Sequence, residues 1–254
     1  MKVEYFSEGS YHLNRQMEFK VYGHGGKPVL VFPTSRGRFY QYEDFGMINS
    51  ISGFIESGAI QVWTCDGIDG ETFLADGGYA HDRIQQHERY FNYINQELIP
   101  IIKDQSRRNN HGDELKLMAT GCSLGAYHSA NIFFRFPEHF DSLIALSGVY
   151  STEHFFGSFM DTPTYFNSPV HYLANLNDEG ILDHYRRSRI YICCGKGNFE
   201  DQMLADSLKI KEILASKNVN AWIDIWGDDV NHDWNWWRMQ MPYFLGDYFK
   251  TGSH

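Results

Sequence analysis

The sequence is poor in cysteine, in positive charge and in long apolar runs, and each shortage excludes a class of protein. Its four cysteines are Cys65, Cys122 and the adjacent pair Cys193 and Cys194. Their spacing matches neither a metal site nor a disulfide framework, and the adjacent pair lies inside an apolar run typical of buried thiols. No His-Glu-x-x-His motif is present either, so we expect no metal.

Positive charge is scarce and scattered. The formal net charge is −10, and the densest basic groups are the short stretches 107–108 and 186–189. Nucleic-acid binding depends on clustered lysine and arginine side chains that neutralise phosphates. We therefore expect no nucleic-acid partner.

Long apolar runs are absent. No window reaches the roughly 18 apolar residues that a membrane-spanning helix needs, which predicts no membrane partner. The stretch 1–5 also lacks the apolar character of a secretory signal, so the sequence predicts a cytoplasmic protein. Neither a repeat nor a linker interrupts the chain, and we expect a single domain over 1–254. No oligomeric state follows from the sequence.

Short β-rich apolar runs alternate with longer helical patterns. This alternation predicts an α/β fold, with a mainly parallel sheet covered by helices on both faces. The expected strands are 17–22, 29–32, 60–64, 115–120, 142–147, 189–194 and 220–225. The expected helices are 44–58, 81–102, 126–136, 201–217 and 234–249.

The segment 150–181 fits neither pattern, because it is rich in aromatic residues and has no clear period. Long insertions after the carboxyl end of a strand are often lids or pocket walls. A loop packed by its own rings is the alternative, and the two interpretations are compatible.

The chemistry-bearing motif is Gly-Cys-Ser-Leu-Gly at 121–125, which matches G-x-S-x-G. It directly follows an expected strand and directly precedes an expected helix. A strand, tight turn and helix in this order expose a serine hydroxyl at the edge of the sheet. Ser123 is therefore the predicted nucleophile.

A serine hydroxyl needs a base to accept its proton. In this architecture the base is a histidine that follows the last strand, and His232 meets that requirement. His128, five residues after the serine on a helix, is better explained as structural. An acid that orients the histidine is expected in the loop 195–202, where Glu200 and Asp201 are both candidates.

An oxyanion would need two backbone N–H donors. One is expected from Leu124, which follows the nucleophile. The second is expected from the loop after strand 29–32, where Ser35 is the first choice and Thr34 the alternative.

The motif at 121–125, the loop 195–201 and the segment 231–234 together resemble the putative-esterase branch of the α/β-hydrolases. That branch includes esterase D, feruloyl esterases, enterochelin esterases and the antigen 85 group, and the likeness extends over about 21–245. The resemblance implies an α/β-hydrolase fold and a cofactor-free carboxylic ester hydrolase. It favours Asp201 as the acid beside Ser123 and His232. In one respect the chain departs from lipases, because Pro-Thr-Ser at 33–35 stands where they have a His-Gly-Gly run.

The expected reaction is acyl transfer from a small-molecule ester through an acyl-enzyme. Phe166, in the aromatic insertion, and Trp234, close to His232, are the expected substrate-binding residues, while Arg36 and Arg38 could attract an anionic substrate. Two alternatives stay open. One is an acyltransferase that uses an alcohol acceptor, and the other is a non-catalytic binding protein with the same fold.

Overall fold

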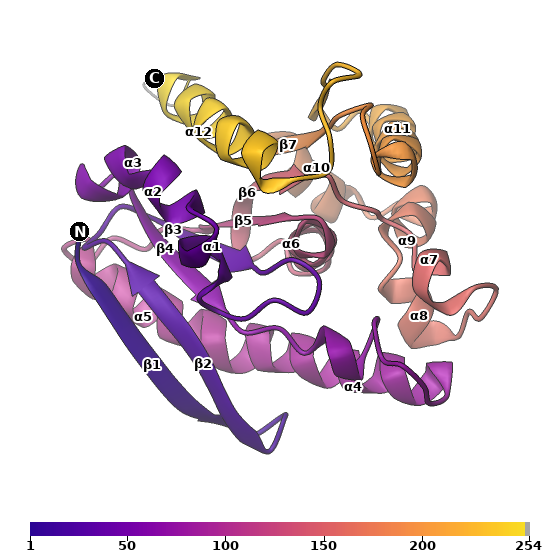
Figure 1. Ribbon diagram of the computed structural model, residues 1–254, viewed down its shortest axis with the longest axis horizontal. Helices are drawn as coiled ribbons and strands as arrows, with labels where there is room; N and C mark the ends of the chain where they lie inside the picture. The colour runs from indigo at the N-terminus through magenta and orange to yellow at the C-terminus, as the bar shows by residue number, and fades with distance from the viewer. Residues whose placement is uncertain (252–254) are drawn as a thin grey trace.

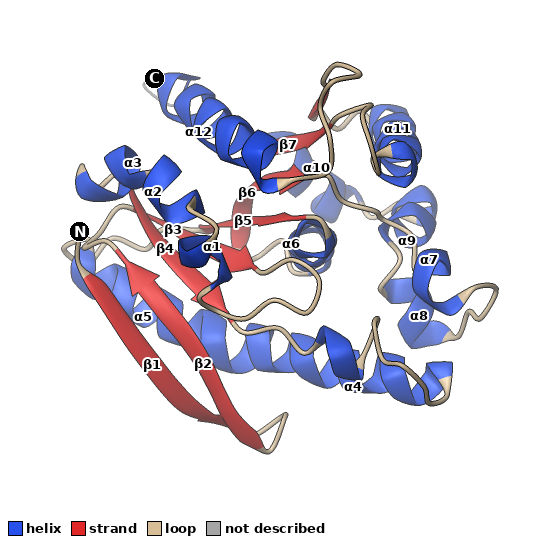
Figure 2. Ribbon diagram, viewed as in Figure 1, coloured by secondary structure: helices blue, strands red, loops and turns tan. Residues whose placement is uncertain are grey.

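The computed structural model describes residues 1–251, and its framework is an eight-stranded sheet. The strand order is β1-β2-β4-β3-β5-β6-β7-β8, with antiparallel pairing only among β1, β2 and β4 (Figure 2). The strands are Val3–Ser10 (β1), Arg15–Tyr22 (β2), Lys27–Phe32 (β3), Ile60–Cys65 (β4), Leu117–Cys122 (β5), Phe140–Leu146 (β6), Arg189–Cys194 (β7) and Trp222–Ile225 (β8). The expected mainly parallel sheet is confirmed.

Helices cover both faces of this sheet (Figure 1). One face is covered by Gln41–Asp44 (α1), Met47–Ser50 (α2), Ser52–Glu56 (α3) and Trp234–Thr251 (α12). The other is covered by Ala80–Tyr93 (α4), Ile99–Asn109 (α5), Leu124–Arg135 (α6), Pro169–Asn175 (α9), Glu179–Arg187 (α10) and Asp201–Ser216 (α11). Between them the two layers bury an apolar core on each face of the sheet.

The central strands are buried on both faces, which is why their sequences read as continuous apolar runs rather than as alternating ones. All six residues of β4 and all six of β5 are buried. Because the parallel strands point the same way, their carboxyl ends meet at one edge. The loops that follow β3, β5, β6, β7 and β8 therefore converge there.

The expected single helix over 44–58 is wrong, because this stretch contains the end of α1 and the two short helices α2 and α3. Gly46 adopts a left-handed conformation with φ 74° and separates the first two. The expected helix 81–102 is present but continues further, as α4, a π-helical turn over Ile94–Leu98 and α5. Strand β1 was not predicted, because its residues are mostly exposed and show no apolar face.

The segment 150–181 is not irregular as expected. It contains the short helices Glu153–Phe156 (α7) and Thr162–Phe166 (α8), then α9 and the start of α10. Asp161 caps α8 and Asp178 caps α10, each by accepting a backbone N–H from the first turn. Helices this short leave no helical period in the sequence.

No helix within residues 1–251 is both long enough and apolar enough to cross a bilayer. The last three residues of the expected domain, 252–254, lie outside the described residues.

Candidate active site

Ser123 occupies a sharp turn between the end of β5 and the start of α6. Its backbone is in the left-handed region, with φ 56° and ψ −125°, a strained conformation for a residue with a side chain. Both flanking glycines are required by close backbone approach. A Cβ at Gly121 would lie 2.3 Å from the carbonyl of Gly125, and one at Gly125 would lie 2.3 Å from the oxygen of Phe32. The local fold therefore explains the whole G-x-S-x-G pattern.

His232 reaches this turn from the loop between β8 and α12. Its Nε2 lies 2.8 Å from Ser123 Oγ, which is hydrogen-bond distance. The ring meets the indole of Trp237 edge-on, with centroids 4.9 Å apart, and this packing limits its rotation. The structure thus brings together two predicted residues that are 109 positions apart in the sequence.

The acid beside His232 is Glu200, and the preference for Asp201 is corrected. Glu200 Oε1 lies 3.3 Å from His232 Nδ1, and the Glu200 side chain is fully buried. Asp201 is exposed and begins α11, where a carboxylate interacts favourably with the helix dipole. Neighbouring side chains at a helix start point in different directions, so only one of the two can face the histidine.

A relay of hydrogen bonds holds the Glu200 carboxylate in place. Ser147, just after β6, donates its hydroxyl to Glu200 Oε1 at 2.6 Å. Trp237 in turn donates its indole N–H to the Ser147 hydroxyl at 3.0 Å. The contact from Glu200 to His232 is longer than the about 2.8 Å of a tight charge-assisted bond. Catalytic hydrogen bonds are often longer in the absence of substrate.

The loop that carries Glu200 and the loop that carries His232 are joined by backbone contacts. The amide of Gly197 donates to the carbonyl of Val230 at 2.9 Å, and the amide of His232 donates to the carbonyl of Asn198 at 3.0 Å. A Cβ at Gly195 would lie only 2.0 Å from the Val230 oxygen. Glycine at this position is therefore what allows the two loops to approach, and it fixes the histidine relative to the acid.

Two backbone amides beside Ser123 are free to bind an oxyanion. Within residues 1–251, neither the Leu124 amide nor the Ser35 amide donates to a protein acceptor. Both residues line the same depression as Ser123. The alternative, Thr34, is not available, because its amide donates to the side chain of Gln41 at 2.8 Å.

A buried aspartate–histidine pair supports the loop that carries Ser35. Asp69 Oδ2 accepts the amide of Arg36 at 3.3 Å, and Asp69 Oδ1 lies 2.9 Å from Nε2 of His128. His128 and Asp69 are both almost fully buried. Since His128 belongs to α6, this contact ties the Ser35 loop to the helix that begins at the nucleophile. This position agrees with the structural role expected for His128. The sequence analysis did not identify its partner, Asp69.

The depression at Ser123 is small, with a volume of about 140 Å³. Its lining consists of Ser35, Ser123, Leu124, Val149, His154, Phe155, Gln202 and Met203. Phe155, an aromatic residue of the segment 150–181, therefore forms part of the wall, which agrees with the expectation that this segment contributes a pocket wall. Sequence reasoning did not single out His154 or Met203, because no local motif marks them.

The two expected substrate-binding residues do not line this depression. Phe166 borders a separate groove, and the ring of Trp234 stacks on Phe45 at a centroid distance of 4.9 Å. The two arginines near Ser35 are already paired, Arg36 with Asp76 at 2.8 Å and Arg38 with Asp66 at 2.6 Å. Their guanidinium groups are thus satisfied within the chain.

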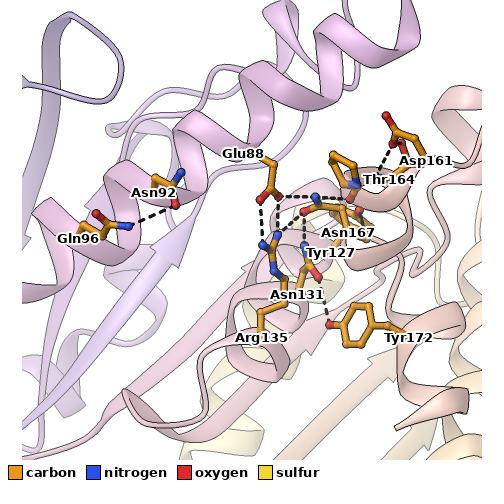
Figure 3. Close-up of polar contacts among 11 residues, drawn as sticks. Glu88, Asn92, Gln96, Tyr127, Asn131, Arg135, Asp161, Thr164, Asn167 and Tyr172 are labelled. Atoms are coloured by element: carbon orange, nitrogen blue, oxygen red, sulfur yellow. Dashed lines mark hydrogen bonds and ion pairs between the residues drawn. The ribbon is translucent and has the colours of Figure 1, made fainter.

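A polar network explains why Phe166 is held away from Ser123. Arg135, the last residue of α6, pairs with Glu88 of α4 at 2.6 Å and donates to the side chain of Asn167 at 2.9 Å. Asn167 follows α8 directly and also donates to Glu88 at 2.6 Å. Figure 3 shows these side chains converging from three elements. The network therefore fixes the end of α8, and Phe166 with it, against α4 and α6.

No group of three or more potential metal ligands is found within residues 1–251. All four cysteines are free and buried, as expected for the adjacent pair. Burial raises the pKa of the Cys122 thiol to about 12, so this neighbour of Ser123 stays protonated.

The site at the edge of the parallel sheet has the parts of a serine hydrolase. They are a half-buried serine that lines a depression, a histidine in contact with it, a buried carboxylate and two free amides. The family is identified independently by the putative esterase model, which matches residues 10–248, so the chain belongs to the putative esterase family. Carboxylic ester hydrolysis is the class of activity that this membership assigns. A search of curated proteins finds no significant match.

Solved structures with similar folds agree with the family. A ferulic acid esterase superposes with a TM-score of 0.73 at 15% identity, covering 96% of each chain. An S-formylglutathione hydrolase from Agrobacterium tumefaciens has a TM-score of 0.70 at 16% identity, covering 96% of this chain and 93% of its own. The fluorophosphonate-binding serine hydrolase F of Staphylococcus aureus has a TM-score of 0.65 at 14% identity, covering 96% of this chain and 97% of its own. At these identities the likeness establishes the α/β-hydrolase fold.

Proposed function

We propose that the protein hydrolyses a small carboxylic ester through an acyl-enzyme on Ser123, with His232 as general base and Glu200 as the orienting acid. The observation that carries this proposal is the 2.8 Å contact between Ser123 Oγ and His232 Nε2 at a strained turn. A hydroxyl in that position is exposed to substrate and has its proton acceptor already in place.

In the first half of the reaction, His232 Nε2 takes the proton of Ser123 as Oγ attacks the ester carbonyl. The amides of Leu124 and Ser35 stabilise the oxyanion, and Glu200 stabilises the imidazolium through Nδ1. The tetrahedral intermediate then collapses. The bond to the alcohol oxygen breaks, and that oxygen receives the proton from His232.

In the second half, water replaces the alcohol. His232 accepts a proton from the water as it attacks the acyl-enzyme, and the new oxyanion uses the same two amides. Cleavage of the acyl bond to Oγ releases the carboxylic acid and returns the proton to Ser123. The apolar side chains of Val149, Phe155 and Met203 around a cavity of about 140 Å³ favour a short acyl group.

The test is the variant Ser123→Ala with a short-chain ester and a fluorophosphonate probe. We expect turnover to fall to background and the covalent adduct to disappear while the thermal unfolding temperature is kept. Ser57→Ala, at an exposed position after α3, is the matched control and should retain both. Near-normal turnover in Ser123→Ala would refute the assignment. Product analysis with added alcohols separates hydrolysis from acyl transfer.

A further inference from the structure

The depression at Ser123 contains an ionisable side chain that the proposed reaction does not use. His154, on α7, lines it together with Ser123 and Leu124. The ring belongs neither to the Ser123–His232–Glu200 set nor to the oxyanion site. Its position beside the nucleophile raises the question of what it contacts when substrate is bound.

One nitrogen of this ring is tied to a buried carboxylate. His154 Nε2 lies 3.0 Å from Asp206 Oδ2 of α11. The same oxygen accepts the amides of Tyr150 at 2.5 Å and Ser151 at 3.1 Å, so three nitrogen atoms surround it. A carboxylate that contacts one ring nitrogen of a histidine fixes the orientation of the ring, and Asp206 is placed to do this for His154.

The other nitrogen is left for solvent or substrate. Within the described part of the chain, Nδ1 of His154 has no hydrogen-bond partner, and the side chain is 24% exposed. The pair formed by His128 and Asp69 is different, because both of its side chains are almost fully buried. Of the two aspartate–histidine pairs near Ser123, only that of His154 can reach a ligand.

The charged groups around His154 favour its cationic form. The hydrogen bond to Asp206 raises the pKa of His154 above its ordinary value; burial opposes this, and the charges of Asp206 and Glu153 add to the increase. Asp206 is the charged group facing the ring from α11, and Glu153 is its neighbour on α7. Glu153 is itself 3.5 Å from Nε2 of His171 on α9.

We propose that His154 binds a carboxylate carried by the substrate, a few bonds away from the scissile ester carbonyl. This inference rests on the proposed function. The rest of the wall is apolar apart from Gln202 and the two serines, which suits a short hydrocarbon link between ester and carboxylate. The chain as a whole carries a net charge of −10 and repels anions, so an anionic substrate needs a local cation such as this one. Half-esters of short dicarboxylic acids have this chemistry.

The experiment compares two esters of equal shape and different charge. Monomethyl succinate carries the carboxylate, and methyl 4-methylpentanoate is its neutral, branched counterpart. We expect His154→Phe to lower the ratio of kcat/KM for the charged ester to that for the neutral ester by about tenfold or more, since a hydrogen bond to a charged group is lost. His81→Phe is the matched control. His81 also pairs with an aspartate, Asp161 at 2.7 Å, but lies outside the depression, so the ratio should not change.

A second pair of esters places the carboxylate on the alcohol side. Butyryloxyacetate and isobutyl butyrate distinguish that position from the acyl position. A His154-dependent preference for the anion in either pair supports the proposal and identifies the side. Equal ratios in the wild type and in His154→Phe for both pairs overturn it. If the neutral esters are hydrolysed in that case, the proposed function stands, whereas failure of a fluorophosphonate to label Ser123 counts against the function itself.

The wild-type pH profile tests the same proposal without a variant. Because His154 is a cation only below its raised pKa, the ratio for the charged over the neutral ester should be highest at about pH 5, where the substrate carboxylate is still ionised. It should fall as the pH rises through that pKa. Any pH dependence that is common to the two esters cancels in the ratio. A ratio independent of pH from 5 to about 9, a range that brackets the ordinary histidine pKa of about 6.5, contradicts the proposal.

Discussion

Glu200 and Asp201 differ by one position in the chain, but their surroundings are opposite. The Glu200 carboxylate is fully buried between His232 and Ser147, whereas Asp201 is exposed in the first turn of α11. An ionised carboxylate in a buried position has a large effect on the imidazole beside it, because little water screens the interaction. An exposed carboxylate at a helix start has only a small local effect.

We therefore predict opposite outcomes for two conservative substitutions. Glu200→Gln keeps the shape but removes the charge that stabilises the imidazolium, and kcat should fall by about 10²–10⁴-fold. Asp201→Asn should keep kcat within about twofold, since its side chain does not reach His232. Steady-state kinetics on one neutral ester checks both. A loss in Asp201→Asn as large as that in Glu200→Gln would contradict the placement.

At the same scale, the sequence could predict Ser123 and His232 because each has a local context, a strand followed by a glycine-flanked turn or a position after the last strand. It could not choose between Glu200 and Asp201, because that choice depends on where α11 begins. His154 and Asp206 were not predictable. They are 52 residues apart, and only the packing of α7 against α11 brings them together.

At the scale of elements, the geometry of the site depends on two loops that follow β7 and β8. Their backbones approach so closely that a side chain at Gly195 has no room, because the nearest atom to its Cβ would be the carbonyl oxygen of Val230. The histidine and its acid are thus positioned by main-chain contacts, which are less easily deformed than side-chain contacts.

Two glycine substitutions, one in the loop after β7 and one in α12, test whether the close approach of the loops positions the site. Gly195→Ala should push the loops apart, lower kcat by at least about tenfold and destabilise the fold by about 1–3 kcal/mol. Gly246→Ala, inside α12, is the control. No atom lies within 4 Å of its added Cβ, so we expect a gain of about 0.5–1 kcal/mol and normal activity. Urea unfolding and ester kinetics measure both. A Gly195→Ala enzyme as active and stable as the wild type would show that the loops tolerate separation.

The elements themselves were predictable where burial imposes a pattern. The runs that became β3, β4 and β7 are mainly apolar, and each was expected close to its observed bounds. The helices of the insertion were not, because α7, α8 and α9 span too few residues to show a period. The start of α8 is set instead by a single cap, Asp161.

At the scale of the whole molecule, the insertion that supplies Phe155 and His154 must be held against the rest of the fold. Its anchor is the network of Arg135, Glu88 and Asn167, which joins the insertion to α4 and α6 (Figure 3). The Arg135 side chain is only 17% exposed, so its ion pair is less screened by solvent than pairs on the surface. Since α6 begins next to Ser123, the same helix connects the nucleophile to this anchor.

Removing the anchor should therefore affect more than local packing. Arg135→Met keeps the apolar part of the side chain but removes the guanidinium group that donates to Glu88 and Asn167, at a cost of about 1–3 kcal/mol. Arg187→Met is the matched control. Arg187 also pairs with a carboxylate, that of Asp183, but is 69% exposed, and such a pair contributes at most about 0.5 kcal/mol.

Hydrogen exchange then locates the effect. In Arg135→Met, peptides from 150–181 should exchange faster than in the wild type under native conditions, while peptides from the central strands keep their protection. Because His154 lies in the loosened segment, KM for the ester substrates should rise more than kcat falls. Equal losses of stability in the two arginine variants, or faster exchange spread evenly over the sheet, would mean that the insertion is held by its apolar contacts and not by this network.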